Sequence, residues 1–270
     1  MSPTVTFLGH ASVLIDTGRT QVLTDPLLFS RVAFLGRVSA EVFADEYAQT
    51  DLVLISHMHA DHCDLRSLRT LEYATIVVPV GSAAWLRSHG VHNVVELPIG
   101  QSLTIDDVTV TTTPAIHDGR RLRWKGPDAD AVGYVIETKG PAPADNTTVY
   151  FAGDTDLFDE MTDLPGVGSQ GIDLALLPVW GWGPNLGPGH MNPERAAHSL
   201  DLLQPSLAVP IHWGTFFPVG LRRLKPSLGS LLSEPPFEFV RHAEQRSAEH
   251  RVQVVQPGGV VSVGNRGDQS

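Results

Sequence analysis

Three histidines and an aspartate lie within six positions of one short stretch, DLVLISHMHADHCDL at residues 51–65. They are His57, His59, Asp61 and His62. Neutral imidazoles and carboxylates are the ligands that borderline divalent ions such as zinc accept. Residues two positions apart in an extended segment point the same way, so His57 and His59 can converge on one point. Asp61 and His62 follow where the chain turns and can serve a second point nearby. The alternative, a set of surface side chains with Asp61 as a helix N-cap, explains this density of ligand types less well.

Two metal ions need more ligands than this stretch supplies, and further candidates stand at the ends of other predicted strands. His117, Asp154 and His212 each come directly after a run typical of a strand. Open α/β sheets carry their ligand sites at the carboxyl ends of strands. A lone histidine at such a place is more often structural, but the recurrence favours ligands. We therefore expect two ligand sets that share a bridging Asp154: His57, His59 and His117 for one ion, and Asp61, His62 and His212 for the other.

This ligand set predicts a binuclear metal-dependent hydrolase of a small ester, lactone or phosphodiester. Two divalent cations, Zn²⁺ or else Mn²⁺, are expected about 3.5–4 Å apart, sharing a hydroxide that attacks the carbonyl or phosphorus centre. The predicted catalytic residues are Asp61, Asp154, which also steers the hydroxide, and His190. His190 belongs to the glycine-rich segment 181–194 and is expected to stabilise developing negative charge, unless it is a surface loop histidine. A second class stays open: a non-catalytic scaffold in which a metal stabilises the fold and the surface binds a partner. A structural zinc site, however, needs only four ligands.

The composition excludes several classes of partner. The 270 residues carry 19 Lys and Arg against 30 Asp and Glu, a net charge of -11, which argues against a nucleic acid or an anionic membrane as the main partner. Cys63 is the single cysteine, so no internal disulfide can form and a reducing, cytoplasmic location is expected. Signal-peptide and membrane-spanning patterns are absent from the sequence. A small-molecule substrate is the expected partner, and residues 1–270 are expected to form one domain.

Runs rich in β-branched and apolar residues predict many strands and fewer helices. Strands are expected at residues 4–9, 11–17, 21–26, 51–56, 75–80, 93–98, 101–105, 108–117, 132–138, 147–154, 172–179 and 206–211, with two short strands within 252–263. Helices are expected at residues 64–72, 81–90, 192–204 and 236–246. Segment 28–47 is irregular and predicts a long loop, with at most a short helix. Together these elements predict an α/β layered sandwich.

The motif HMHADH at residues 57–62 resembles the H-x-H-x-D-H motif of the metallo-β-lactamase superfamily, and FAGDT and IHWGTF resemble its later ligand motifs. Further pieces are similar to two branches, the bacterial L-ascorbate-6-phosphate lactonases and the N-acylphosphatidylethanolamine-hydrolysing phospholipases D: GHASVLID, LTDPLLFSR, PAIHDGR and GHMNPERA. The resemblance implies a four-layer αβ/βα sandwich with two facing mixed β-sheets and the metal site along one edge between them. It also implies a homo-oligomer. Redox di-iron members carry a carboxylate at the second motif position, where this chain has His59.

Other residues have both a functional and a structural interpretation. The resemblance puts His10 near the metal site, with a role toward either a ligand or the substrate. Asp25 is expected to orient a ligand imidazole, unless it only forms a turn before Pro26. Cys63 is expected to pack as a small hydrophobic residue. The basic run GRRLRWK is either a phosphate site or a solvated face. Three tryptophans either wall a substrate pocket or fill the core: Trp180, Trp182 and Trp213.

Overall fold

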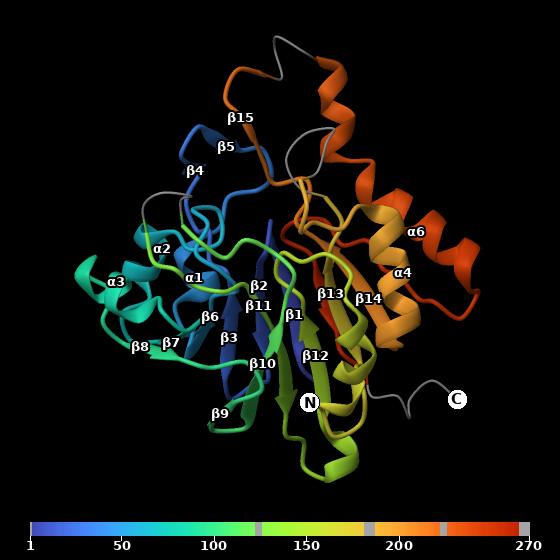
Figure 1. The fold of residues 1–270 in the computed structure, drawn as a ribbon, viewed down its shortest axis with the longest axis horizontal. Helices are drawn as coiled ribbons and strands as arrows, with labels where there is room; N and C mark the ends of the chain where they lie inside the picture. The colour runs from blue at the N-terminus through green and yellow to red at the C-terminus, as the bar shows by residue number, and fades with distance from the viewer. Residues whose placement is uncertain (1, 122–125, 181–186, 222–225, 265–270) are drawn as a thin grey trace.

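The structure is a computed structural model that describes residues 2–121, 126–180, 187–221 and 226–264. Two large sheets dominate this described part (Figure 1). The first has the strand order β16 (Val260–Ser262), β1 (Thr4–Gly9), β2 (Ser12–Asp16), β3 (Gln21–Thr24), β6 (Leu52–Leu54), β7 (Thr75–Val78) and β8 (Val94–Glu96). The second has the order β14 (Leu207–Ile211), β13 (Leu174–Pro178), β12 (Thr147–Phe151), β11 (Val132–Thr138), β10 (Val108–Pro114) and β9 (Ser102–Ile105). Both sheets contain parallel and antiparallel pairs, so both are mixed, as predicted.

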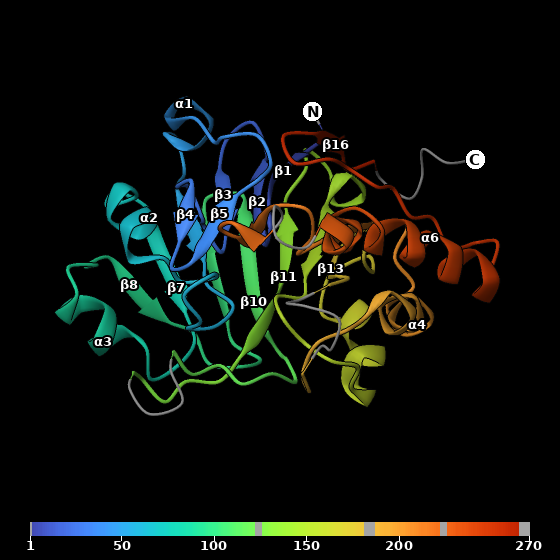
Figure 2. The same ribbon diagram turned by 90° about the horizontal axis from the view of Figure 1, so that it is seen from above.

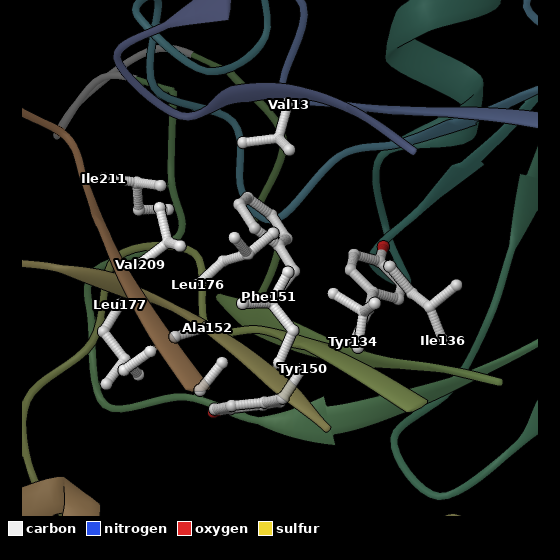
Figure 3. Packing of buried hydrophobic residues seen from close by; sticks show 14 of the residues in the cluster. Val13, Tyr134, Ile136, Tyr150, Phe151, Ala152, Leu176, Leu177, Val209 and Ile211 are labelled. Atoms are coloured by element: carbon white, nitrogen blue, oxygen red, sulfur yellow. The ribbon is translucent and has the colours of Figure 1, made fainter. Parts of the chain in front are cut away.

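The two large sheets face each other across one apolar core. Alternate residues of β2 point to opposite sides of a strand: Val13 joins the cluster shared with the second sheet, whereas Leu14 joins a separate cluster on the outer side. In β6, Leu52 and Leu54 face inward and Val53 faces outward in the same way. Figure 3 shows the side chain of Val13 pointing from the first sheet toward residues of the second, among them Phe151, Leu176 and Ile211, which belong to the same cluster. This alternation places one sheet on the other.

Helices cover the outer faces of both sheets and complete four layers. Beside the first sheet lie α2 (Leu65–Thr70) and α3 (Ala83–Ser88), whose apolar residues belong to its outer cluster. Beside the second lie α4 (Pro193–Leu203) and α6 (Pro235–Arg246), which contact β13, β14 and each other. Figure 2 shows the two pairs of helices on opposite sides of the molecule. Asn192 caps α4 by accepting a hydrogen bond from the backbone N–H of Arg195, as the sequence led us to expect. The predicted αβ/βα sandwich is confirmed.

Some elements differ from the prediction. Segment 28–47 contains a short helix, α1 (Ala44–Tyr47), but also two short strands, β4 (Arg31–Val32) and β5 (Leu35–Arg37). With β15 (Phe216–Pro218) they form a third, small sheet in the order β15, β5, β4. These strands are only two or three residues long, and β5 pairs with a segment far away in the chain, so no local periodicity indicates them. Only one of the two strands expected within 252–263 forms, since Val252 makes an isolated bridge to Ala208. Short 3₁₀ helices cover η1 (Pro143–Asp145), η2 (Asp159–Gly166) and η3 (Pro226–Leu232).

Strand direction decides where the predicted site residues lie. In the first sheet, β3 and β6 are parallel, and β1 runs with them because both β1 and β3 are antiparallel to β2. In the second sheet, β10, β12, β13 and β14 share one direction for the same kind of reason. The carboxyl ends of each set therefore meet at one edge of its sheet. A search of the described helices finds none that is long and apolar enough to cross a membrane.

Candidate metal centre and active site

The carboxyl ends of four strands bring all seven predicted ligands to one place. His57 to His62 follow β6, His117 follows β10, Asp154 follows β12 and His212 follows β14. The buried side chains of His10 and Asp25 come directly after β1 and β3. Within the described residues, potential ligand atoms form four groups, each lying within 4.8 Å: His57, His59 and His117; His10, Asp61, His62 and His212; Asp25, His57 and His62; and His117, Asp154 and His190.

The first expected ligand set is a compact group of imidazole nitrogens. Nδ1 of His59 lies 2.9 Å from Nε2 of His57 and 3.2 Å from Nε2 of His117. His57 is fully buried and the other two are partly exposed. One point can therefore be reached by three nitrogens from two different sheets.

The second expected set faces the first across Asp154. Nε2 of His62 lies 3.2 Å from Nε2 of His212. The two oxygens of Asp154 divide between these rings, with Oδ1 at 3.3 Å from His212 and Oδ2 at 3.4 Å from His62. Oδ2 of Asp61 lies 4.0 Å from Nε2 of His62. Asp154 also belongs to a group with His117 of the first set, which is the placement that a bridging carboxylate requires.

The spacing of these atoms fits a bound divalent cation. Zinc–nitrogen bonds of about 2.0–2.1 Å in a tetrahedron put neighbouring ligand atoms about 3.3 Å apart, and the separations above are 2.9–3.4 Å for the imidazoles and Asp154. Oδ1 of Asp154 is buried and accepts no hydrogen bond from the described residues. A buried carboxylate oxygen without a donor is costly unless a cation or proton neutralises it. The donor set of five imidazoles and two carboxylates suits zinc and related transition ions.

The outer ring nitrogens of the ligand imidazoles are held by fixed acceptors. Nδ1 of His62 donates to Oδ2 of Asp25 at 2.7 Å, Nδ1 of His117 donates to the Gly189 carbonyl at 2.9 Å, and Nδ1 of His212 donates to the Trp180 carbonyl. A proton on Nδ1 leaves the lone pair on Nε2, directed at the proposed cation. These contacts thus fix the tautomer in which Nε2 faces the proposed cation whenever the ring is neutral.

His57 is oriented through a relay that also ends on Asp25. Oγ of Ser56 lies 3.0 Å from Nδ1 of His57 and donates to Oδ2 of Asp25 at 2.6 Å. Because its proton goes to Asp25, this hydroxyl accepts the Nδ1 proton of His57. Oδ1 of Asp25 accepts the Ser56 backbone N–H at 2.7 Å. One buried carboxylate therefore orients one imidazole of each expected set, which is the position that the sequence predicted for Asp25. The contribution of Ser56 was missed, and the polar residue that ends the apolar run 51–56 was the available signal.

Backbone strain is concentrated at this site. Of the non-glycine residues that the structure describes, six have positive φ, and three of them are His10 (57°), Asp25 (33°) and His212 (65°). Such conformations cost free energy in L-residues and persist where the surrounding structure holds them, often at functional sites. The backbone thus turns sharply after β1, β3 and β14 to aim these side chains inward.

Burial and neighbouring charge separate the titration of the imidazoles. Burial lowers the pKa of His57 well below its usual value, that of His59 to about 4 and that of His212 to about 3. Burial acts in the same direction on His62, but the carboxylates of Asp154 and Asp25 outweigh it and raise its pKa well above 6.5. The imidazoles of His57, His59 and His212 are therefore neutral near pH 7, the form that binds metal.

His190 lies between the site and a cavity of about 690 Å³. Its Nε2 is 3.5 Å from Oδ2 of Asp154, and this contact raises the pKa of His190 against the lowering effect of burial. Trp180, at 9% exposure, lines the same cavity. The cavity walls come from the amino-terminal ends of α4 and α6 and include Glu194 and Glu234.

The other residues that the sequence singled out either pack in the core, hold the loop after β6 by hydrogen bonds, or lie outside the described part. Trp213 is buried in the core, where its ring packs against Phe7, and Trp182 lies outside the described residues. Cys63 is fully buried in the outer cluster, and burial raises its thiol pKa to about 12, which confirms its packing role. In the basic run 119–125, Arg120 pairs with Asp118, residues 122–125 lie outside the described part, and Arg121 donates to the carbonyls of Met58 and Cys63.

Comparison with known proteins assigns the chain to a family. The model of the beta-lactamase superfamily domain matches residues 13–213. A UPF0173 metal-dependent hydrolase of Methanopyrus kandleri is 30% identical over 94% of this chain and 97% of its own. One of Opitutus terrae is 32% identical over 96% and 99%. The solved structure of Igni18, a metallo hydrolase from Ignicoccus hospitalis, superimposes with a TM-score of 0.72 at 24% identity, covering 98% of this chain and 99% of that one. The chain therefore belongs to the metallo-β-lactamase superfamily and is a metal-dependent hydrolase of the UPF0173 group.

Proposed function

We propose that this hydrolase is binuclear, and that it cleaves a small ester, lactone or phosphodiester. The observation that carries the proposal is a pair of ligand groups that lie close together at the carboxyl ends of the strands. The two oxygens of Asp154 face His62 and His212 of the second group, and Asp154 also lies close to His117 of the first. The seven proposed ligands are His57, His59, Asp61, His62, His117, Asp154 and His212. Held by these residues, two divalent cations, Zn²⁺ or Mn²⁺, would supply an activated water near neutral pH and would polarise the oxygen of the scissile group.

The protein side chains supply orientation and a proton. Asp154 lies close to members of both ligand groups and would orient the attacking nucleophile there. His190 holds a proton on Nε2 at pH 7 more firmly than a free imidazole, since Asp154 raises its pKa. A donor at this point stabilises negative charge that develops on the substrate oxygen and can protonate a leaving group. Asp61, Asp154 and His190 are thus the proposed catalytic residues.

The cavity beside His190 supports a small-molecule substrate. Its volume of about 690 Å³ lies within the roughly 300–1,000 Å³ of ordinary ligand pockets. Its described lining includes Glu194, Glu234 and Glu238, while Arg195 in the same lining is paired with Asp156. Glu238 pairs with Arg241, whereas Glu194 and Glu234 form no ion pair with a described residue. The two unpaired carboxylates favour neutral or cationic groups over a phosphate at this end of the substrate. The resemblance to lactonases and phospholipases sets the bond types that are worth testing.

A substrate screen of metal-analysed protein tests the proposal. Purified protein should contain close to two metal ions per chain and hydrolyse at least one of a set of lactones, phosphodiesters and acyl amides. His59→Ala should lose turnover and metal together, because His59 contacts both other imidazoles of its set. His198→Ala, which removes an exposed histidine of α4, should change neither. Turnover that survives complete chelation, or a single tightly held metal ion without hydrolysis, would contradict the binuclear mechanism.

Three wider expectations accompany this proposal. We propose that residues 1–270 form one domain, which is supported by the apolar cluster that both large sheets share. A homo-oligomer is proposed from the resemblance alone. The cytoplasmic location, inferred from the single cysteine, stays a prediction.

A further inference from the structure

His10 is held in a strained conformation directly beside the second ligand group. It follows β1 with φ at 57°. Its backbone N–H donates to Oγ1 of Thr215 at 2.6 Å, and its carbonyl accepts the backbone N–H of His212 at 2.7 Å. Its ring packs on the ring of His212 with centroids 3.9 Å apart, and lies edge-to-face with Phe216 at 5.8 Å. Both the backbone and the ring are therefore fixed from several sides.

The free end of the His10 ring points at Asp61. Nε2 of His10 is buried and forms no hydrogen bond that meets normal geometry with any described residue. It lies 3.3 Å from Oδ2 of Asp61, closer than the 4.0 Å between that oxygen and Nε2 of His62. A buried ring nitrogen without a partner is unfavourable, so its direction toward a carboxylate indicates that the contact has a use.

Asp61 is restrained less by the rest of the structure than the other proposed ligands of its set and Asp154. Its side chain is 23% exposed, against 0% for His62 and 4% for Asp154. The imidazoles of His62 and His212 have fixed acceptors for their outer nitrogens, whereas His10 is the nearest basic group to the Asp61 carboxylate among the described residues. An unrestrained carboxylate loses rotamer freedom when it binds a cation, which weakens binding.

We propose that His10 is a positioning residue that holds Asp61 in its metal-binding rotamer. Nε2–H of His10 donates to Oδ2 of Asp61 and leaves Oδ1 free for the cation. The inference rests on the proposed ligand set and adds to it the group that orients Asp61. Glycine or asparagine would adopt this left-handed backbone with less strain, so the contact of the His10 ring with Asp61 gives a reason for a histidine at this turn.

Metal affinity in a double-mutant cycle tests this role without relying on turnover. Zinc affinity is measured by chelator competition, and the cobalt(II) absorption spectrum is recorded, for wild type, His10→Asn, Asp61→Ala and the double variant. Asparagine tolerates positive φ and its short amide does not reach Asp61. His10→Asn should weaken one of the two ions about 10–100-fold, the usual effect of losing an orienting partner, and should change the cobalt spectrum. The double variant should bind no more weakly than Asp61→Ala, because His10 acts through Asp61.

Two further variants control for folding and for general histidine loss. His10→Gln keeps a longer amide that can donate to Asp61, and glutamine already occupies positive φ in this chain at Gln204. It should recover part of the affinity that His10→Asn loses, and it decides the outcome if the asparagine variant fails to fold. His198→Asn, on the surface of α4, should bind both ions like wild type.

Three outcomes would overturn the inference. Wild-type affinity for both ions in folded His10→Asn would show that Asp61 needs no such partner. If the losses of metal affinity of His10→Asn and Asp61→Ala added in the double variant, His10 would act on the metal independently of Asp61. Wild-type protein that binds fewer than two ions would remove the proposed binuclear site itself, and so separates failure of the proposed function from failure of this role alone.

Discussion

Replacing Asp25 by asparagine should weaken both metal ions at once, although Asp25 is not a proposed ligand. Oδ2 of Asp25 accepts from Nδ1 of His62 and from Oγ of Ser56, which in turn accepts from Nδ1 of His57. An amide nitrogen at the Oδ2 position would donate where the carboxylate accepts. The proton of His62 then moves from Nδ1 to Nε2, and the Ser56 hydroxyl turns to donate to Nδ1 of His57. Both ligand nitrogens lose their free lone pairs.

The size of the effect follows from this shared role. Loss of one orienting partner typically costs about 10–100-fold in metal affinity. Since Asp25 orients one imidazole of each ligand set, the product of the two dissociation constants should rise about 10²–10⁴-fold, or about 2.7–5.5 kcal/mol in total. Ser56→Ala breaks only the relay to His57 and should weaken one ion by about 10–100-fold. The two variants therefore differ in how many ions they affect.

Chelator-competition titration with zinc, combined with native mass spectrometry to count the ions per chain, measures both variants against wild type. Thermal unfolding of the chelated proteins shows whether the fold survives each change. Asp25→Asn protein that loads two ions with wild-type affinity would refute the argument. So would a Ser56→Ala variant that weakens both ions as strongly as Asp25→Asn, because the serine reaches only His57.

The remaining predictions concern the metal-binding loop. Arg121→Ala should destabilise the protein by about 2–4 kcal/mol in urea unfolding, since it leaves the buried carbonyls of Met58 and Cys63 without their donor. The control Arg120→Ala breaks only an exposed ion pair and should cost under about 1 kcal/mol. Equal losses of stability in the two variants would refute this distinction. In chelated protein, burial holds the pKa of His59 at about 4, below the unfolded value of about 6.5, so only the unfolded chain binds this proton in that window and stability is lost as the pH falls through it. His59→Asn should flatten this loss between pH 6.5 and 5 by at most about 1.4 kcal/mol per pH unit, and unfolding curves with the wild-type slope would contradict the burial of His59.

The sequence by itself determined the proposed ligands and their approximate place. His57, His59, Asp61 and His62 are close in the chain, and the apolar run before them predicts a buried strand, so their position at a strand end needs no tertiary information. The same reasoning applied to His117, Asp154 and His212, because the hydrophobic pattern of each strand is local. The layered α/β class followed from the same pattern, and the superfamily motif extended it to two facing sheets.

Tertiary structure alone decided how these residues act on one another. In His62 and His117, the nitrogen that faces the proposed cation depends on acceptors such as Asp25 and the Gly189 carbonyl, which reach the site from other strands and loops. The contact of His10 with Asp61 depends on a left-handed turn that the sequence does not announce. The small third sheet forms because short strands distant in the chain meet. Strand register and packing across the whole chain set such contacts, and a local pattern of residue types carries no information about them.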